Sequence, residues 1–157
     1  MATLKDRLDQ YPGQPEQAWM NRKNITVSEK GQSYGVTFTR ACMSAVFAID
    51  GGIIKDTNSV KCDKLVLLCL DDQSFYELFV ELKGADIKHA IEQIEQTLKM
   101  PLFQDKAVKT RQARIIGRHI PKNTGSSITE IAKKNFIKKY QCRLEFKTGP
   151  AKETLTL

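Results

Sequence analysis

One segment, residues 61–98, constrains the fold more strongly than any other part of the chain. It holds an apolar run over residues 65–70, a polar turn, a second apolar run over residues 75–82, and then a helical pattern. A run that is apolar at every position is typical of a strand buried on both faces. We therefore expect two neighbouring central strands, over residues 60–70 and 75–82, with a helix packed against them.

The helix after these strands has signals at both ends. Asp86 can cap its first turn, and Pro101 ends it. Its apolar residues recur at positions 87, 90, 91, 94 and 98, which share one face of a helix. The spacing predicts a helix over residues 87–98 with its apolar face on the sheet.

The remaining segments predict further strands and a second long helix. Alternating apolar residues over 25–38, interrupted by a turn at 30–33, indicate an antiparallel hairpin, and a strand over 45–49 ends at an Asp-Gly-Gly turn. Residues 102–112 are expected to form a basic connection to a strand over 113–120. A capping box begins a helix that runs to Tyr140, with Ile128 and Ile131 facing inward, and a short strand over 143–147 follows.

The order of these elements predicts one α/β (α+β) domain over residues 1–157. We expect a mixed central sheet flanked by helices, with an N-terminal antiparallel strand region. Residues 1–24 are expected to be partly irregular, with a short helix over 4–8, and residues 148–157 to form a tail without a structural signal. A chain of 157 residues suits a single core.

Composition favours a protein of the reducing cytoplasm without a membrane partner. No apolar run approaches the roughly 20 residues of a membrane helix, and the first residues lack the apolar core of a secretion signal. The four cysteines form no CxxC pair and have no zinc-site spacing. Free cysteines of this kind are typical of cytoplasmic proteins.

The charges are divided unevenly along the chain. From residue 105 onward there are 13 Lys and Arg against 4 Asp and Glu, whereas residues 1–104 hold 12 against 14. A basic half of this kind indicates a polyanionic partner, such as nucleic acid. Excess lysine can also serve solubility alone, and charge by itself does not separate the two interpretations.

Acidic and basic residues at the ends of the two central strands point to metal-assisted chemistry. Asp63 begins the first strand, and Glu81 stands near the end of the second. Carboxylates from two strands can share Mg²⁺, with the backbone carbonyl of Leu82 as a third ligand. Lys83 shares a strand face with Glu81, so it can orient an attacking water and stabilise charge on a phosphoryl group.

The arrangement of Asp63, followed by Glu81-Leu82-Lys83 on the next strand, resembles the PD-(D/E)xK nuclease superfamily. Gln93, on the following helix, matches the glutamine that this family often carries there, and Gln96 is a second candidate. The resemblance implies a restriction-endonuclease-like fold and an endonuclease or other nuclease that depends on Mg²⁺, with Mn²⁺ as a substitute. Asp63, Glu81, Lys83 and Gln93 would be its catalytic residues.

Two features depart from the usual pattern of this family. Cys62 precedes the first acid where many members have proline. An additional acid near the N-terminus is also unassigned: Glu16, Glu29 and Asp50 are alternatives. Asp50 follows a strand and could reach the metal, although a turn residue that binds its own backbone is the favoured interpretation.

The basic half supplies candidate contacts to nucleic acid, with DNA favoured over RNA. These candidates are Arg111, Arg114, Arg118, Lys122, Lys133 and Lys134. Phosphate contacts of this type position a substrate without reading its sequence. One centre cuts one strand, so a homodimer would suit duplex cleavage, and a small domain of this type suits a phage or defence context. The alternative is a catalytically inactive nuclease-fold subunit that binds nucleic acid or a partner protein.

Overall fold

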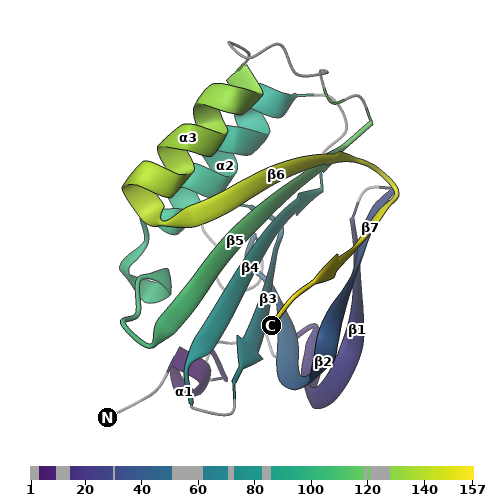
Figure 1. Ribbon diagram of the computed structural model, residues 1–157, viewed down its shortest axis with the longest axis vertical. Helices are drawn as coiled ribbons and strands as arrows, with labels where there is room; N and C mark the ends of the chain where they lie inside the picture. The colour runs from purple at the N-terminus through teal and green to yellow at the C-terminus, as the bar shows by residue number, and fades with distance from the viewer. Residues whose placement is uncertain are drawn as a thin grey trace.

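The computed structural model describes residues 4–9, 15–29, 31–50, 62–70, 73–82, 86–118, 120 and 128–157. The chain forms an α+β fold with a mixed seven-stranded sheet and three α-helices in this described part (Figure 1). In chain order the elements are α1 (Leu4–Asp9), β1 (Gln17–Glu29), β2 (Gln32–Ala48), β3 (Lys64–Cys69), β4 (Phe75–Leu82), α2 (Ile87–Leu98), a 3₁₀ turn η1 (Pro101–Phe103), β5 (Val108–Gly117), α3 (Ile128–Tyr140), β6 (Cys142–Thr148) and β7 (Ala151–Leu155).

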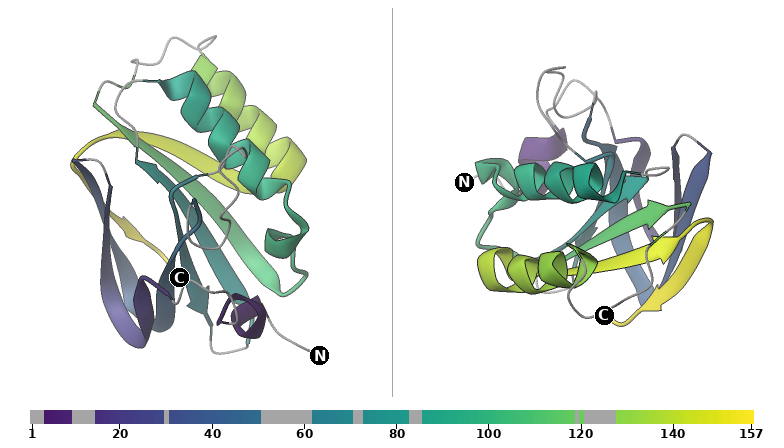
Figure 2. Two further views of the ribbon diagram at one scale, coloured as in Figure 1. Left: turned by 180° about the vertical axis from the view of Figure 1, so that it is seen from behind. Right: turned by 90° about the horizontal axis from the view of Figure 1, so that it is seen from above.

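The sheet changes from antiparallel to parallel along its strand order, β1-β2-β3-β4-β5-β6. The pairs β1–β2, β2–β3 and β3–β4 are antiparallel, whereas β4–β5 and β5–β6 are parallel. Parallel neighbours need a crossover connection, and α2 and α3 lie in these two connections. Both helices lie side by side on one face of the sheet (Figure 2).

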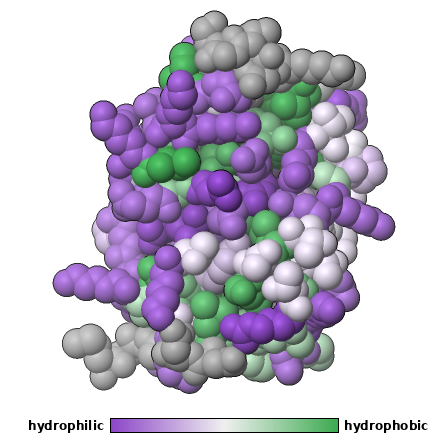
Figure 3. Space-filling model, in the orientation of Figure 1, coloured by the Kyte–Doolittle hydropathy of each residue, from purple (hydrophilic) through white to green (hydrophobic). Residues whose placement is uncertain are grey.

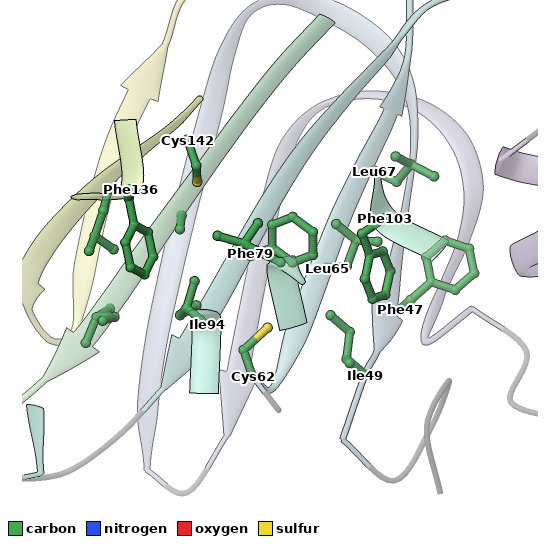
Figure 4. Close-up of a cluster of buried hydrophobic side chains, with 14 of the residues drawn as sticks. Phe47, Ile49, Cys62, Leu65, Leu67, Phe79, Ile94, Phe103, Phe136 and Cys142 are labelled. Atoms are coloured by element: carbon green, nitrogen blue, oxygen red, sulfur yellow. The ribbon is translucent and has the colours of Figure 1, made fainter. Parts of the chain in front are cut away.

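The central strands bury both of their faces, which explains their continuous apolar sequence. On the helix side, Leu65 and Leu67 of β3 join a core that includes Phe79 and Phe103, whose ring centroids are 5.3 Å apart (Figure 4). Val66 and Leu68 face the opposite side, where they meet residues of β1, β2 and β7. The expectation of two buried central strands is confirmed, although β3 begins at Lys64 instead of residue 60.

The opposite face is covered because the long strand β2 pairs with two different strands along one edge. Its second half, Met43–Ala48, pairs with β3, and its first half, Tyr34–Phe38, pairs in parallel with β7. Gly149 lies at the corner between β6 and β7, and its N–H donates to the Gly117 carbonyl at 2.9 Å. A Cβ at this position would lie 2.8 Å from Ile116 Cγ2, so the corner requires glycine.

Several expectations from the sequence are confirmed. The α+β class, the mixed sheet, helix α2 and strand β4 agree with the expected elements, and α3 ends at Tyr140 as expected.

Other expectations are wrong. Strand β1 begins at Gln17, β2 is one strand instead of two, and β5 begins at Val108 within the expected connection. The expected tail contains β7, and Ile128 and Ile131 are exposed, with 42% and 53% of their surface accessible. Strand β7 holds few apolar residues and forms by pairing with the distant strand β2, so it left no local pattern to predict it.

Candidate metal centre

The side chains of Asp63 and Glu81 meet where β3 begins and β4 ends. Antiparallel pairing places Lys64 opposite Val80, so the residues that flank them are neighbours. The backbone N–H of Asp63 donates to Glu81 Oε1 at 3.1 Å, and the N–H of Leu82 donates to Asp63 Oδ2 at 2.9 Å. The Glu81 carboxylate therefore binds the main chain of Asp63, and the Asp63 carboxylate binds the main chain of the residue after Glu81. These two contacts fix both carboxylates at one place.

Three other elements hold the backbone around Asp63. Directly after β2, the N–H of Ile49 donates to the Asp63 carbonyl at 2.9 Å. From α2, the hydroxyl of Thr97 accepts the N–H of Cys62 at 2.9 Å and donates to the Gln93 carbonyl at 2.8 Å. Because β2, β4 and α2 all contribute, the position of the Asp63 carboxylate is set by the packed fold.

Both carboxylates are buried, Glu81 completely and Asp63 with 6% of its surface exposed. Burial of two like charges is costly, because a low-polarity environment weakens hydration and strengthens their repulsion. Burial raises the pKa of the neighbouring Cys62 thiol well above its usual value, and the charges of Glu81 and Asp63 add to the rise.

The two candidate glutamines of α2 lie in different environments. Gln93 is buried, with 6% of its surface exposed, and Gln96 is exposed. Gln93 thus shares the sheet-facing side of the helix with Thr97. Thr97 was missed in the sequence interpretation, and a hydroxyl within the apolar face of a helix is the signal that could have revealed it.

The three candidates for a third acid lie in two places. Lys64, 4% exposed, binds Glu16 Oε1 at 2.5 Å and Glu29 Oε2 at 3.1 Å through its Nζ atom. Lys64 precedes Leu65 and faces away from the helices, so these two glutamates serve an ion pair outside the centre. Asp50 is exposed and directly follows Ile49, which places it at the same end of the sheet as Asp63.

The basic candidates are divided between interior and surface. Arg114 is 2% exposed, and its Nε donates to Glu153 Oε2 at 2.6 Å, so it belongs to the interior and is not placed to contact phosphate. Arg111 binds Glu77 Oε1 at 2.8 Å and two main-chain carbonyls. Arg118 is exposed at the end of β5. Burial of Arg114 could not be foreseen because Glu153 belongs to the unexpected strand β7.

On α3, Lys134 is exposed, and Lys133 lies within 3.5 Å of both Glu130 and Glu145. Lys83 and Lys122, which the sequence also singled out, lie outside the described residues.

The groups at Asp63 and Glu81 fit a hard divalent cation. Carboxylate oxygens and main-chain carbonyls are the ligand types that Mg²⁺ prefers, usually completed by water and a substrate phosphate. The Leu82 N–H donates to Asp63 Oδ2 at 2.9 Å, so the main chain of Leu82 lies beside this carboxylate. Among the described residues, no three side chains of His, Cys, Asp or Glu gather into a metal-binding group, so an ion here would have two side-chain ligands from this part of the chain.

Comparison with known proteins found no family model, no curated protein and no solved structure that matches the chain. None of the described helices has both the length and the apolar character needed to cross a membrane.

Proposed function

We propose that this protein is a metal-dependent nuclease that hydrolyses phosphodiester bonds in DNA. The observation that carries the proposal is the placement of two buried carboxylates from adjacent strands, where Glu81 Oε1 accepts the Asp63 N–H and Asp63 Oδ2 accepts the Leu82 N–H. The order Asp63, then Glu81-Leu82-Lys83, supports the same function through its resemblance to PD-(D/E)xK nucleases. The mixed sheet with α2 packed beside β4 is compatible with a restriction-endonuclease-like fold, which forms part of the proposal.

Each residue of the centre has a role in this proposal. Asp63 and Glu81 hold Mg²⁺, or Mn²⁺ in its place, together with the Leu82 carbonyl. When bound, the ion supplies Lewis acidity toward the scissile phosphate and the attacking water. Lys83, two residues after Glu81, orients that water and stabilises negative charge on the phosphoryl oxygens. Gln93 orients the substrate from the sheet-facing side of α2.

Net charge supports a polyanionic substrate. The chain carries a formal charge of +7, and the bases concentrate after residue 105. Arg118 and Lys134 are exposed and remain candidate phosphate contacts. Because one centre cuts one strand, we propose that two copies act together on a duplex, and that the protein works in the cytoplasm.

Cleavage assays test this function directly. The protein is incubated with supercoiled plasmid, linear duplex, single-stranded DNA and RNA, each with Mg²⁺, Mn²⁺ or EDTA. We expect cleavage of DNA only when a divalent ion is present. Glu81→Gln and Asp63→Asn should each lower the rate by about a hundredfold or more, the scale on which loss of one electrostatic group changes an enzymatic rate.

The matched control is Glu92→Gln, which removes the same charge from an exposed position on α2 and should cleave like the wild type. Calorimetric titration with Mn²⁺ measures binding independently of cleavage. Undiminished cleavage by Glu81→Gln, or cleavage in EDTA, would refute the proposed centre. Absence of both metal binding and cleavage would instead favour a catalytically inactive subunit.

A further inference from the structure

Helix α3 carries apolar side chains on two opposite sides. Ala132 and Phe136 pack into the helix-side core. Of the five large hydrophobic side chains that are exposed in the described part of the chain, three also belong to this helix: Ile128, Ile131 and Ile137, with 42%, 53% and 56% of their surface accessible. Packing on the sheet does not account for these three isoleucines. Apolar side chains that gather on one exposed face mark an interaction surface.

Two lysines lie between the exposed isoleucines. Ile131, Lys134 and Lys138 recur at i, i+3 and i+7, so they lie along the side of α3 that is turned away from the sheet. At 3.6 residues per turn, Ile128 and Ile137 lie on either side of this row. We call these five residues the outer face of α3. Hydrophobic patches lie among hydrophilic side chains on the surface over this helix (Figure 3).

The outer face carries positive charge. Lys134 and Lys138 are exposed. Glu130 is the one acidic residue in the sequence of α3, and Lys133 Nζ lies 3.5 Å from its Oε1 atom and 3.4 Å from Glu145 Oε2. Both of these acids therefore pair with a lysine that does not belong to the outer face. The two lysines of the outer face thus attract a negatively charged partner.

A pocket of about 380 Å³ opens beside the outer face, where α3 ends and β6 begins. Its lining combines the apolar side chain of Ile137 with Gln141, Cys142 and Arg143, together with residues of β5. No carboxylate occurs among the described residues that line it. A concave site beside an exposed isoleucine can receive one side chain of a bound protein, and such anchor residues contribute much of the energy of an interface.

The arrangement of the outer face is unfavourable for three other occupants. In a two-fold contact between the α3 helices of two copies, Lys134 and Lys138 would meet like charges. A helix that lies on a lipid surface separates its charged side from its apolar side, whereas here the lysines lie between the isoleucines. DNA offers mainly phosphate groups, which bind polar and cationic side chains and give the isoleucines no role.

We infer that the outer face of α3 binds an acidic amphipathic helix of a partner protein. Carboxylates in the middle of the partner helix pair with Lys134 and Lys138, and apolar residues on both sides of them contact Ile131 and Ile137. One apolar side chain of the partner enters the pocket beside Ile137. Helix α3 is about 20 Å long, which matches a partner helix of about three to four turns. The inference goes beyond the proposed nuclease function and does not rest on it.

Designed peptides test this surface on the full chain. The probe is a fluorescein-labelled helical peptide of about 16 residues, with leucines on both sides of a row of glutamates. Two companion peptides replace all glutamates by lysine, or all leucines by glutamine. Fluorescence anisotropy should show binding of the first peptide with a Kd below about 100 μM, and binding of each companion that is weaker by about tenfold or more.

Variants of the outer face separate its apolar and charged contributions. Ile131→Gln/Ile137→Gln and Lys134→Glu/Lys138→Glu should each weaken binding of the acidic peptide by about tenfold or more. The charge reversal should also create binding of the lysine peptide, a gain that loss of folding cannot produce. Glutamine and glutamate both favour helix formation, so thermal unfolding should show that every variant is folded.

The matched controls lie on the strands. Met20→Gln/Met43→Gln removes two other exposed hydrophobic side chains, on β1 and β2. Lys23→Glu/Lys152→Glu reverses two exposed charges, on β1 and β7. Each control should change the affinity for the acidic peptide by less than about twofold.

Absence of binding by the acidic peptide, or an equal loss of affinity in test and control variants, would overturn the inference. Without peptide binding, self-association in sedimentation velocity that Ile131→Gln/Ile137→Gln abolishes would make the outer face a contact between copies. Binding to phosphatidylglycerol vesicles or to labelled DNA that the same variant abolishes would assign the face to that ligand instead. A protein that binds the acidic peptide and cleaves no nucleic acid would support the inference and refute only the nuclease function.

Discussion

Two glutamates on the same face of β4 are fully buried, and their partners give them different roles. Glu77 binds the Arg111 guanidinium, which pairs its charge inside the protein. Glu81 accepts the backbone N–H of Asp63, a second acid. The Glu77 carboxylate is thus part of an ion pair with Arg111, whereas the Glu81 carboxylate binds the backbone of a second acid. The two glutamates are equally buried, and they differ in the groups that their carboxylates bind.

The burial of Glu77 predicts that the stability of the fold depends on pH. Burial raises the pKa of Glu77 from its usual 4.5 to about 7, although Arg111 acts in the opposite direction. Since the folded protein holds this proton more tightly than the unfolded chain, the stabilisation is complete below pH 4.5 and is lost as the pH rises through about 7. Glu77→Gln should remove this decline, measured as the free energy of unfolding in urea between about pH 4 and pH 8.

Glu92→Gln is the control for this experiment, because Glu92 is exposed on α2 and should leave the decline in place. The same pH dependence in Glu77→Gln and in the wild type would show that another group is responsible.

At the residue scale, the sequence was informative where neighbouring residues determine the chemistry. Asp63 and Glu81 could be paired because the turn between their strands is short. The same approach assigned Arg114 to the surface, although it binds Glu153, which is 39 positions away. An alternating sequence pattern indicates which face of the sheet a side chain occupies. It does not indicate whether a distant strand covers that face.

Helix α2 acts on the candidate centre through one buried hydroxyl. Thr97 accepts the N–H of Cys62 and is itself fully buried, so the helix and the start of β3 are joined by this contact. Cys62 directly precedes Asp63. A shift of α2 along the sheet would therefore move the backbone that carries the first acid, which makes Thr97 a positioning residue for the proposed metal site.

Replacement of this hydroxyl should affect both stability and metal affinity. Thr97→Val keeps the shape of the side chain but leaves the buried N–H of Cys62 without its acceptor, at a cost of about 1–3 kcal/mol in the free energy of unfolding. Mn²⁺ binding, measured by calorimetry on folded protein, should weaken by about 10–100-fold, as is usual for loss of a group that orients a metal ligand. Thr97→Ser restores the hydroxyl and should recover most of the affinity. Equal weakening in both variants would show that packing, and not the hydrogen bond, is what matters.

Among the elements, those with dense apolar patterns could be predicted and those with sparse patterns could not. The apolar stripe of α2 and the apolar run of β4 each predict the element that forms, because each can bury a complete face of that element. Strand β7 has five residues, and only Ala151 and Leu155 are buried. It becomes a strand because it pairs with Tyr34–Phe38, and contacts over such a sequence separation leave no local signal.

For the whole molecule, the candidate centre lies at the end of a sheet that is packed on both faces. The helix-side core meets Asp63 and Glu81 through Cys62 and Phe79, and the opposite core meets them through Val80 and Leu82. Packing on both faces of the sheet thus holds the two carboxylates in place. Binding of a divalent cation at the centre should therefore stabilise the complete fold, as for any ligand that binds only the folded state.

This coupling gives a prediction that does not depend on any substrate. Saturating Mg²⁺ or Mn²⁺ should raise the midpoint of thermal unfolding, because an ion at a hundred times its Kd stabilises the folded state by about 2.7 kcal/mol. For a chain of this length, each kcal/mol added to the free energy of unfolding raises the midpoint by about 2–4 °C. Glu81→Gln should abolish the shift while Glu92→Gln, at an exposed position, keeps it. The same shift in Glu81→Gln as in the wild type would place the ion elsewhere on the protein, and no shift in the wild type would remove the metal from the proposed mechanism.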